Sequence, residues 1–382
     1  MACANICSHD SIEVFESELG FKYPRIIVER CVDCGLCKRV CPANNARELV
    51  FPGKCYAARL NDSYLLNESA SGGAATAFAL AVIQSGGVVI GCSGENMMDV
   101  KHIVIESEKD IHKLQGSKYV QSSIADDLYQ RIKKFLSTGR MVLFIGTACQ
   151  TAGLQNFLLK PYENLFTVDL ICHGVPSQKM LNDCICSYTG MDPDTLKFRQ
   201  KISNANSKTI RYGWFYTIHS GENARQNFVP AHKNPYMAAF LDLLTFRECC
   251  YRCKYAYSAR QSDITIGDFW GLGANGSSKI NPREGASVIL IVTNKGHRLL
   301  DLAKTLLYIE EREIQEAIMG NRQLQLPSKE NPLRRRFEAL YKTKGFVNAI
   351  RSTTIRNNRL KRVFLIPGKI IKIVASYFHI KL

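Results

Sequence analysis

The chain has 382 residues, of which 46% are apolar, and this content excludes disorder as the dominant state. Its 15 cysteines are too sparse for a disulfide-stapled scaffold, and the first residues contain no basic leader followed by an apolar run, so we expect a cytoplasmic protein with reduced cysteines that bind metal. The net charge of +16 is uneven, because residues 331–382 carry +12 and the rest of the chain only +4.

Composition predicts three regions. Residues 1–55 contain seven of the 15 cysteines and little helical periodicity. Residues 56–330 alternate apolar strand-like runs with helix-like runs, which indicates an α/β domain with a mixed sheet. Residues 331–382 are basic and broken by Gly345 and Pro367, so we expect an amphipathic helical tail in two or more pieces.

The first region contains the spacing C-x2-C-x2-C-x3-C-P, formed by Cys31, Cys34, Cys37, Cys41 and Pro42. This spacing is typical of ferredoxins that bind [4Fe–4S] clusters, in which the fourth cysteine ligates the other cluster of a pair. Zinc sites use pairs of C-x2-C instead. We therefore predict a ferredoxin-like domain in residues 1–55 that binds at least one [4Fe–4S] cluster.

Cys3 and Cys7 resemble the second half of another such motif. If the two halves are related by the usual pseudo-twofold axis, Cys7 completes the cluster of Cys31, Cys34 and Cys37, whereas Cys3 and Cys41 belong to a cluster that lacks two ligands. Three interpretations remain open: the natural chain begins further upstream, that cluster has been lost, or it recruits a ligand from elsewhere, such as Cys55. Residues 12–27 fit the strand and turn that join two ferredoxin halves.

The middle region contains five apolar runs that predict buried strands, namely 87–92, 141–145, 165–171, 263–266 and 286–292. Helices are expected at 73–84, 124–136, 151–158 and 295–307. Several of these strands end in glycine followed by polar residues, the edge where open α/β sheets place their ligands.

Six separated segments of the chain, in the same order, resemble the coenzyme F420 hydrogenase/dehydrogenase beta subunit family. They are the ferredoxin region, Ser71-Gly72-Gly73, residues 116–120 (GSKYV), 146–150 (GTACQ), 172–177 (CHGVPS), and 250–253 (CYRC) followed by 262–271 (SDITIGDFWG). The resemblance implies an iron–sulfur flavoprotein with FAD, [4Fe–4S] clusters and cytosolic electron transfer. The cofactor-binding residues expected within these segments are Ser71, Gly72, Gly73, Lys118, Thr147, Gln150 and Asp268.

Gly72 and Gly73 stand where a helix begins, so their backbone N–H groups and the helix dipole attract an anion such as a pyrophosphate. Lys118 is placed to neutralise one phosphate. The alternative is a tight turn that only packs a helix against a strand. Asp268 follows a predicted strand and either contacts the flavin ribityl chain or caps a turn.

Cys149 and Cys172 each follow an apolar strand, and Cys250 and Cys253 are spaced as a metal-binding pair. These four thiols predict a second [4Fe–4S] cluster beside the flavin, with Cys249 as an alternative ligand. A zinc site, a redox dithiol and plain buried cysteines are the rival interpretations. Cys92, Cys184 and Cys186 are expected in the core or in helices.

His173 lies between a predicted ligand and a glycine, and we expect it to donate a proton during flavin or substrate reduction. A structural histidine bonded to backbone is the alternative. The basic tail, with interleaved aromatic residues, fits either peripheral attachment to an anionic membrane surface or docking of an acidic electron donor. Nucleic acid is not expected, because nothing in the rest of the chain supports it.

The predicted function is that of an oxidoreductase. Electrons pass between ferredoxin or coenzyme F420 and a small organic substrate through [4Fe–4S] clusters and FAD, which converts single electrons into a hydride. The sequence leaves the direction open. Two alternatives from other classes are a non-catalytic electron-relay subunit of a larger redox complex and a metal-binding structural module.

Overall fold

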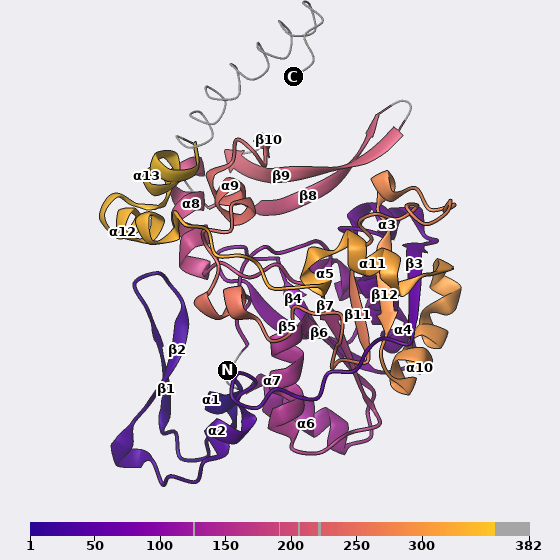
Figure 1. Cartoon of the computed structure of the whole chain (residues 1–382), viewed down its shortest axis with the longest axis horizontal. Coiled ribbons are helices and arrows are strands. Elements are labelled where there is room, and N and C mark those ends of the chain that lie inside the picture. Colours follow the sequence, from indigo (N-terminus) through magenta and orange to yellow (C-terminus); the bar gives the residue numbers. More distant parts are fainter. Residues whose placement is uncertain (125–126, 191, 205–206, 221–222, 356–382) are drawn as a thin grey trace, which may run out of the picture.

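A large mixed β-sheet organises the protein. The computed structural model describes residues 1–124, 127–190, 192–204, 207–220 and 223–355. Eight strands lie in the order β13-β3-β12-β11-β7-β6-β4-β5, with helices on both faces (Figure 1). Their bounds are Lys54–Leu60 (β3), Val88–Ser93 (β4), Lys101–Ile105 (β5), Val142–Thr147 (β6), Leu165–Leu170 (β7), Ile264–Asp268 (β11), Ser287–Ile291 (β12) and Leu307–Arg312 (β13).

The centre of the sheet is parallel and its margins are antiparallel. β4, β6, β7 and β11 pair in parallel, whereas β5, β12, β3 and β13 join antiparallel to their neighbours. Parallel strands need both faces covered, which explains why their sequences are continuous apolar runs rather than alternating ones. In β4, Val89 packs on one face and Val88 and Ile90 pack on the other.

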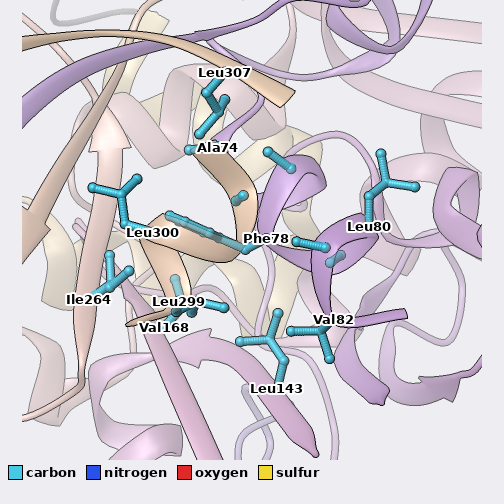
Figure 2. Packing of buried hydrophobic residues seen from close by; sticks show 14 of the residues in the cluster. Ala74, Phe78, Leu80, Val82, Leu143, Val168, Ile264, Leu299, Leu300 and Leu307 are labelled. Carbon is cyan, nitrogen blue, oxygen red and sulfur yellow. The ribbon is translucent and has the colours of Figure 1, made fainter. Parts of the chain in front are cut away.

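Helices α4 (Ala74–Gln84) and α10 (Asn294–Ala303) cover one face, and α6 (Leu128–Ser137) and α7 (Ala148–Leu158) cover the other. Nine of the eleven residues of α4 are buried, so this helix is apolar on nearly all sides. Figure 2 shows Phe78 of α4 among Val168, Ile264 and Leu299. Shorter helices complete this part of the chain: α3 (Ser63–Glu68), α5 (Ile111–Leu114) and α11 (Ile314–Gly320).

A second, three-stranded antiparallel sheet is inserted after α8 (Gln178–Thr189). It consists of β8 (Thr195–Asn204), β9 (Ser207–Ser220) and β10 (Asn223–Pro230), and it is followed by α9 (Pro235–Leu241). Helix α13 (Phe346–Ile350) packs against α8 and α9, and α12 (Arg334–Lys344) packs against α13 and donates from its Tyr341 hydroxyl to Asp183 of α8 (2.6 Å). Trp214, Tyr236, Phe337 and Phe346 form part of the core that joins these elements.

The described part of the basic tail therefore belongs to the folded body. Phe337, Tyr341 and Phe346 are buried, so these three aromatic side chains serve the core and are not available to a membrane or a partner. Phe364, Tyr377 and Phe378, on which the tail prediction also rested, lie outside the described residues, as does Pro367. Among the described helices, none is long and apolar enough to span a bilayer.

The N-terminal region consists of α1 (Ala2–Ile6), the hairpin β1 (Ile12–Glu16) and β2 (Lys22–Ile26), and α2 (Leu36–Val40). The hairpin confirms the strand and turn predicted for residues 12–27. Helix α1 contacts α2, α6 and α7, and it is fixed to the large domain by hydrogen bonds from Tyr129 N to Asn5 Oδ1 (3.3 Å) and from Gln130 Nε2 to Asn5 O (3.2 Å). The N-terminal region is therefore docked on the α/β domain.

All five predicted strands and all four predicted helices of the middle region are present, with shifted ends. The helix predicted at 151–158 begins at Ala148, because Thr147 and Gln150 form a capping box there. The helix predicted at 295–307 was too long: it ends at Ala303, and Leu307 begins β13 by pairing with Leu60. The domain boundaries at residues 55 and 330 stay a prediction.

Candidate functional site

A cavity of about 740 Å³ opens at the carboxyl ends of the parallel strands. The residues at the ends of β6, β7 and β11 line it, together with the start of α4, the loop before Val120 and two strands of the inserted sheet. Open α/β sheets bind ligands at this edge, and the volume lies in the range of small-molecule and cofactor sites. The predicted residues Ser71, Gly73, Lys118, Thr147, Gln150, Cys172, His173 and Asp268 all line this cavity.

The glycine turn before α4 is tightly packed. A Cβ atom on Gly72 would lie 2.1 Å from Ala58 O and 2.4 Å from Ser287 N, and Gly73 has a φ of +84° at the N-cap of α4. The hydroxyl of Ser71 donates to Ala286 O (2.9 Å). Gly72 itself does not line the cavity. It is thus required for packing, whereas Ser71, Gly73 and the first turn of α4 face the ligand space.

Lys118 supplies a positive charge to the wall of the cavity. Its Nζ donates to Leu114 O and Gln115 O, both at 2.8 Å. Burial lowers the pKa of Lys118 to about 8, so the ammonium is still largely protonated at pH 7. No carboxylate among the described residues forms an ion pair with it, and an anionic ligand in the cavity would balance its charge.

A buried ion pair lies in the wall near Lys118, since Arg199 Nε also donates to Ser117 Oγ (3.1 Å). Arg199 of β8 donates to Asp268 Oδ2 at the end of β11 (2.6 Å), and Tyr212 of β9 lies beside the guanidinium. The other carboxylate oxygen, Asp268 Oδ1, is buried without a hydrogen-bond partner in the described part of the chain. Because buried acceptors are normally hydrogen-bonded, we expect a ligand hydroxyl or N–H group to donate to this oxygen.

His173 lines the cavity near this ion pair. Burial lowers the pKa of its ring, and the charge of Asp268 partly offsets that effect. The ring lies 6.4 Å from that of Phe240, while the backbone carbonyl of His173 accepts from Ser328 Oγ (2.5 Å). The hydrogen bond from Ser328 thus holds the backbone of His173 in place. Its imidazole is the titratable side chain nearest in sequence to Cys172.

Thr147 and Gln150 act first as a helix cap. Gln150 Oε1 accepts from the backbone N–H and the hydroxyl of Thr147, both at 3.0 Å. Gln150 Nε2 in turn donates to Ser122 Oγ (3.0 Å), which donates to His102 Nδ1 (3.0 Å). His102 Nε2 lies 3.1 Å from Ile145 O, which can only accept, so the Nε2–H tautomer is fixed.

His102 is the buried end of this chain of hydrogen bonds. Its ring stacks on Phe144 at 5.3 Å with an interplanar angle of 10°. Burial lowers the pKa of His102 to about 4, so the ring is neutral at pH 7. The network gives this wall of the cavity fixed donors and acceptors.

The inner cysteines converge beside the cavity. The thiol of Cys172 lies within electrostatic range of those of Cys149, Cys250 and Cys253. Desolvation by the surrounding protein raises the pKa of Cys149 to about 11 and that of Cys172 to about 12. A hydrogen bond from Cys250, aided by Arg247, lowers the pKa of Cys249 to about 6.

All the predicted ligands of the inner site are thiols. The five thiols are joined by no carboxylate or imidazole ligand, and soft thiolates favour iron–sulfur clusters and zinc. Within the described ranges, no three His, Cys, Asp or Glu side chains are close enough to hold one metal ion.

The N-terminal cysteines form two further groupings. Ser11 links Cys7 to the main motif, because its N–H lies 3.4 Å from Cys7 Sγ and its hydroxyl donates to Arg30 O (2.6 Å), next to Cys31. Cys3 and Cys41 lie within electrostatic range of each other. These neighbours agree with the predicted division of ligands. Cys55 does not join Cys3 and Cys41: it is buried in β3, with Glu316 and Arg312 as its charged neighbours.

Tyr255 connects the outer and inner cysteines. Its hydroxyl donates to Pro42 O (3.0 Å), and its buried ring packs against Ala148 and Ala152 of α7. Cys41, Cys149 and Cys253 all lie near enough for their charges to act on its phenol. Tyr255 therefore lies near cysteines of both groups.

Several residues of the site escaped the sequence analysis. Arg199 and Tyr212 belong to the inserted sheet, where no motif marks them, and they reach the cavity only through the tertiary fold. His102 is a lone histidine in a short edge strand. Trp270 did stand in a matched segment, and its exposed ring lies 6.3 Å from that of Tyr212.

Comparisons with known proteins fit this arrangement. Residues 1–45 match the 4Fe-4S dicluster domain. Residues 55–128 and 139–317 match the N-terminal and C-terminal parts of the coenzyme F420 hydrogenase/dehydrogenase beta subunit. No curated protein matches the chain significantly.

Among solved structures, the chain is similar to one from the F420-reducing [NiFe] hydrogenase complex of Methanosarcina barkeri. The identity is 19% and the TM-score 0.45, and the match covers 74% of this chain and 97% of the other. The two family matches, which together span most of residues 55–317, carry the assignment. The protein belongs to the coenzyme F420 hydrogenase/dehydrogenase beta subunit family.

Proposed function

We propose that this protein is an iron–sulfur flavoprotein oxidoreductase. Electrons pass between a carrier, ferredoxin or coenzyme F420, and a small organic substrate, and the protein works in the cytoplasm. The single observation that carries the proposal is the position of Cys172, which lines the 740 Å³ cavity and also lies within electrostatic range of three other cysteines. A flavin in the cavity would thus adjoin a metal centre.

The cavity suits FAD on three counts. Lys118 and the first turn of α4 offer positive charge at one end, where a diphosphate would bind. Asp268 Oδ1 lacks a donor within the described residues, and a ribityl hydroxyl would supply one. The hydrogen-bond network from Thr147 to His102 fixes polar groups along the wall. FAD, when bound, exchanges single electrons with iron–sulfur centres and a hydride with an organic acceptor.

The protein side chains then have defined tasks. Lys118 holds the anionic group of the cofactor, and the Arg199–Asp268 pair orients one of its polar groups. Tyr212 and Trp270 line the cavity with aromatic rings. His173 supplies or accepts the proton at its imidazole that accompanies reduction of the substrate.

The cysteines near the proposed metal centres fall into three sets, of which two bind clusters. Cys7, Cys31, Cys34 and Cys37 hold one [4Fe–4S] cluster, and Cys149, Cys172, Cys250 and Cys253 hold a second, with Cys249 as the alternative. Cys3 and Cys41 are left as a pair near Tyr255. Since the thiols of Cys149 and Cys172 are neutral before metal binds, cluster assembly there releases protons.

Anaerobic quantification of iron, sulfide and flavin on one preparation tests the proposal. We expect about eight irons and one FAD per chain, since each cubane holds about four irons. The double variant Cys172→Ala/Cys253→Ala should contain about four irons fewer, whereas Cys186→Ala, on the exposed side of α8, should retain all of them. Protein with full iron but no flavin would refute the flavoprotein assignment.

A second function, that of a non-catalytic relay subunit, rests on the exposure of the N-terminal motif. Cys31 and Cys34 are exposed, and so are Val28 (76%) and Val32 (58%) beside them. An apolar surface around a metal centre suits a permanent redox partner. Purified protein that reduces no small acceptor alone, but does so when a partner is added, would favour this function.

A further inference from the structure

A small basic hollow lies where the N-terminal region meets α7. It has a volume of about 210 Å³ and is lined by Arg39, Arg47, Gln155, Asn156, Leu159, Lys160 and Pro161. Arg39 belongs to α2 and Arg47 to the segment after the cysteine motif, whereas Lys160 follows α7. Three cations from separate segments thus surround one depression of the surface.

The charge of this hollow is not neutralised locally. Among the described residues, no carboxylate forms an ion pair with Arg39, Arg47 or Lys160. Glu163, the acid that follows Lys160 in the sequence, is engaged by Arg298 at 2.8 Å. Exposed Lys38 and Lys254 flank the same region, where Lys254 Nζ donates to Ala43 O (2.7 Å), and Glu48 is the acid adjacent to Arg47.

The hollow offers an apolar contact as well as positive charge, and this combination suits binding to another protein. Leu159 lines it with 48% of its surface exposed, so an apolar side chain stands among the cations. Side chains of this kind at the centre of a charged rim are typical of electrostatically steered interfaces. Asn156 Nδ2 donates to Asn45 O (2.9 Å), and this bond holds the two sides of the hollow together.

The hollow also adjoins the cysteine groups. Arg47 lies close enough to Tyr255 for its charge to act on the phenol, and the same phenol is near Cys41, Cys149 and Cys253. Arg39 stands two residues before Cys41 on the chain. A redox partner seated here would therefore lie near Tyr255, which is close to both the outer and the inner cysteines.

We propose that this hollow is the docking site of an acidic one-electron carrier protein of the ferredoxin class. The inference rests on the proposed electron-transfer function and names its partner surface, placing docking on the body of the protein instead of on the basic tail. Each encounter oxidises the reduced carrier by one electron and reduces a centre of this chain by one. Two encounters, with one proton from solvent, supply a hydride equivalent.

A binding titration with a purified bacterial ferredoxin tests this proposal. The full-length holoprotein is compared with Arg47→Glu/Lys160→Glu. The matched control is Lys369→Glu/Lys372→Glu, which makes the same charge change in the tail. At an ionic strength of about 0.01 M, we expect the hollow variant to bind at least about tenfold more weakly, since steering by a charged surface changes association 10–10³-fold. The difference should shrink at about 1 M salt, where the Debye length is about 3 Å.

Two outcomes would overturn the proposal: unchanged affinity in the hollow variant, or a loss confined to the tail variant. Iron and flavin contents of each variant show whether it has folded with its cofactors. Reduction of the flavin by dithionite needs no carrier protein, so its failure in the wild type would count against the proposed function. Failure of the docking proposal, in contrast, is judged from the binding isotherms alone.

Discussion

The Arg199–Asp268 pair offers a quantitative test of the cavity wall. Its nitrogen and oxygen are 2.6 Å apart, and the side chains are only 8% and 19% exposed. At an effective dielectric constant of 20, two unit charges at that separation attract by about 6 kcal/mol before desolvation is subtracted. Removing one partner of such a pair leaves an uncompensated buried charge and costs about 3–5 kcal/mol.

We therefore expect Arg199→Gln and Asp268→Asn each to lower the free energy of unfolding by about 3 kcal/mol. The double variant should lose much less than the sum, because neither charge is then left alone, and the coupling energy should be about 2–3 kcal/mol. Anaerobic urea unfolding followed by two probes measures it. Additive losses would show that the two charges do not stabilise each other, and would refute the account of this wall.

Three further predictions concern single side chains. The pKa of His102 is about 4 in the folded protein and about 6.5 in the unfolded chain, so its contribution to stability is complete above pH 6.5 and is lost as the pH falls toward 4. Between about pH 7.5 and pH 5, the free energy of unfolding of the wild type should fall by roughly 2 kcal/mol more than that of His102→Gln, as measured by urea unfolding. Gly72→Ala should lower thermal stability and flavin content, because its Cβ would overlap the backbone of two strands, whereas Gly53→Ala meets no atom within 4 Å and should leave both unchanged. Cys37→Ala should remove about four irons per chain in an iron assay, and an unchanged iron content would exclude Cys37 as a ligand.

The sequence predicts the centre of the fold better than its margins. Strands buried on both faces are continuous apolar runs, so β6 (Val142–Thr147), β7 (Leu165–Leu170) and β12 (Ser287–Ile291) can be recognised from composition alone. Edge strands such as β13 carry charged residues on their exposed side. Their pairing depends on neighbours far away in the sequence, as Leu307 with Leu60 shows. For this reason the helix predicted at 295–307 extended past the end of α10 at Ala303 and into the first residue of β13.

The site divides in the same way. Residues whose role is set by the local chain, such as Gly73 at the N-cap of α4, are visible from sequence. Arg199 reaches the cavity from the inserted sheet, and no spacing relates it to Asp268, 69 residues later. The prediction for the tail aromatics was too polar: Phe337 and Phe346 lie in a basic segment, but both are buried in the same core cluster as Trp214 and Tyr236.

The docking of the N-terminal region explains how one chain can hold separate redox groups without losing contact between them. Electron tunnelling weakens steeply with distance, so a flexibly tethered ferredoxin domain would transfer electrons only in its rare close positions. Here α1 is fixed to α6 by Asn5, and Tyr255 fixes Pro42 to the segment that carries Cys253. These contacts hold the outer cysteines at a set distance from the inner ones. The same junction forms the basic hollow, so a carrier bound there, as we propose, would lie near cysteines of both groups.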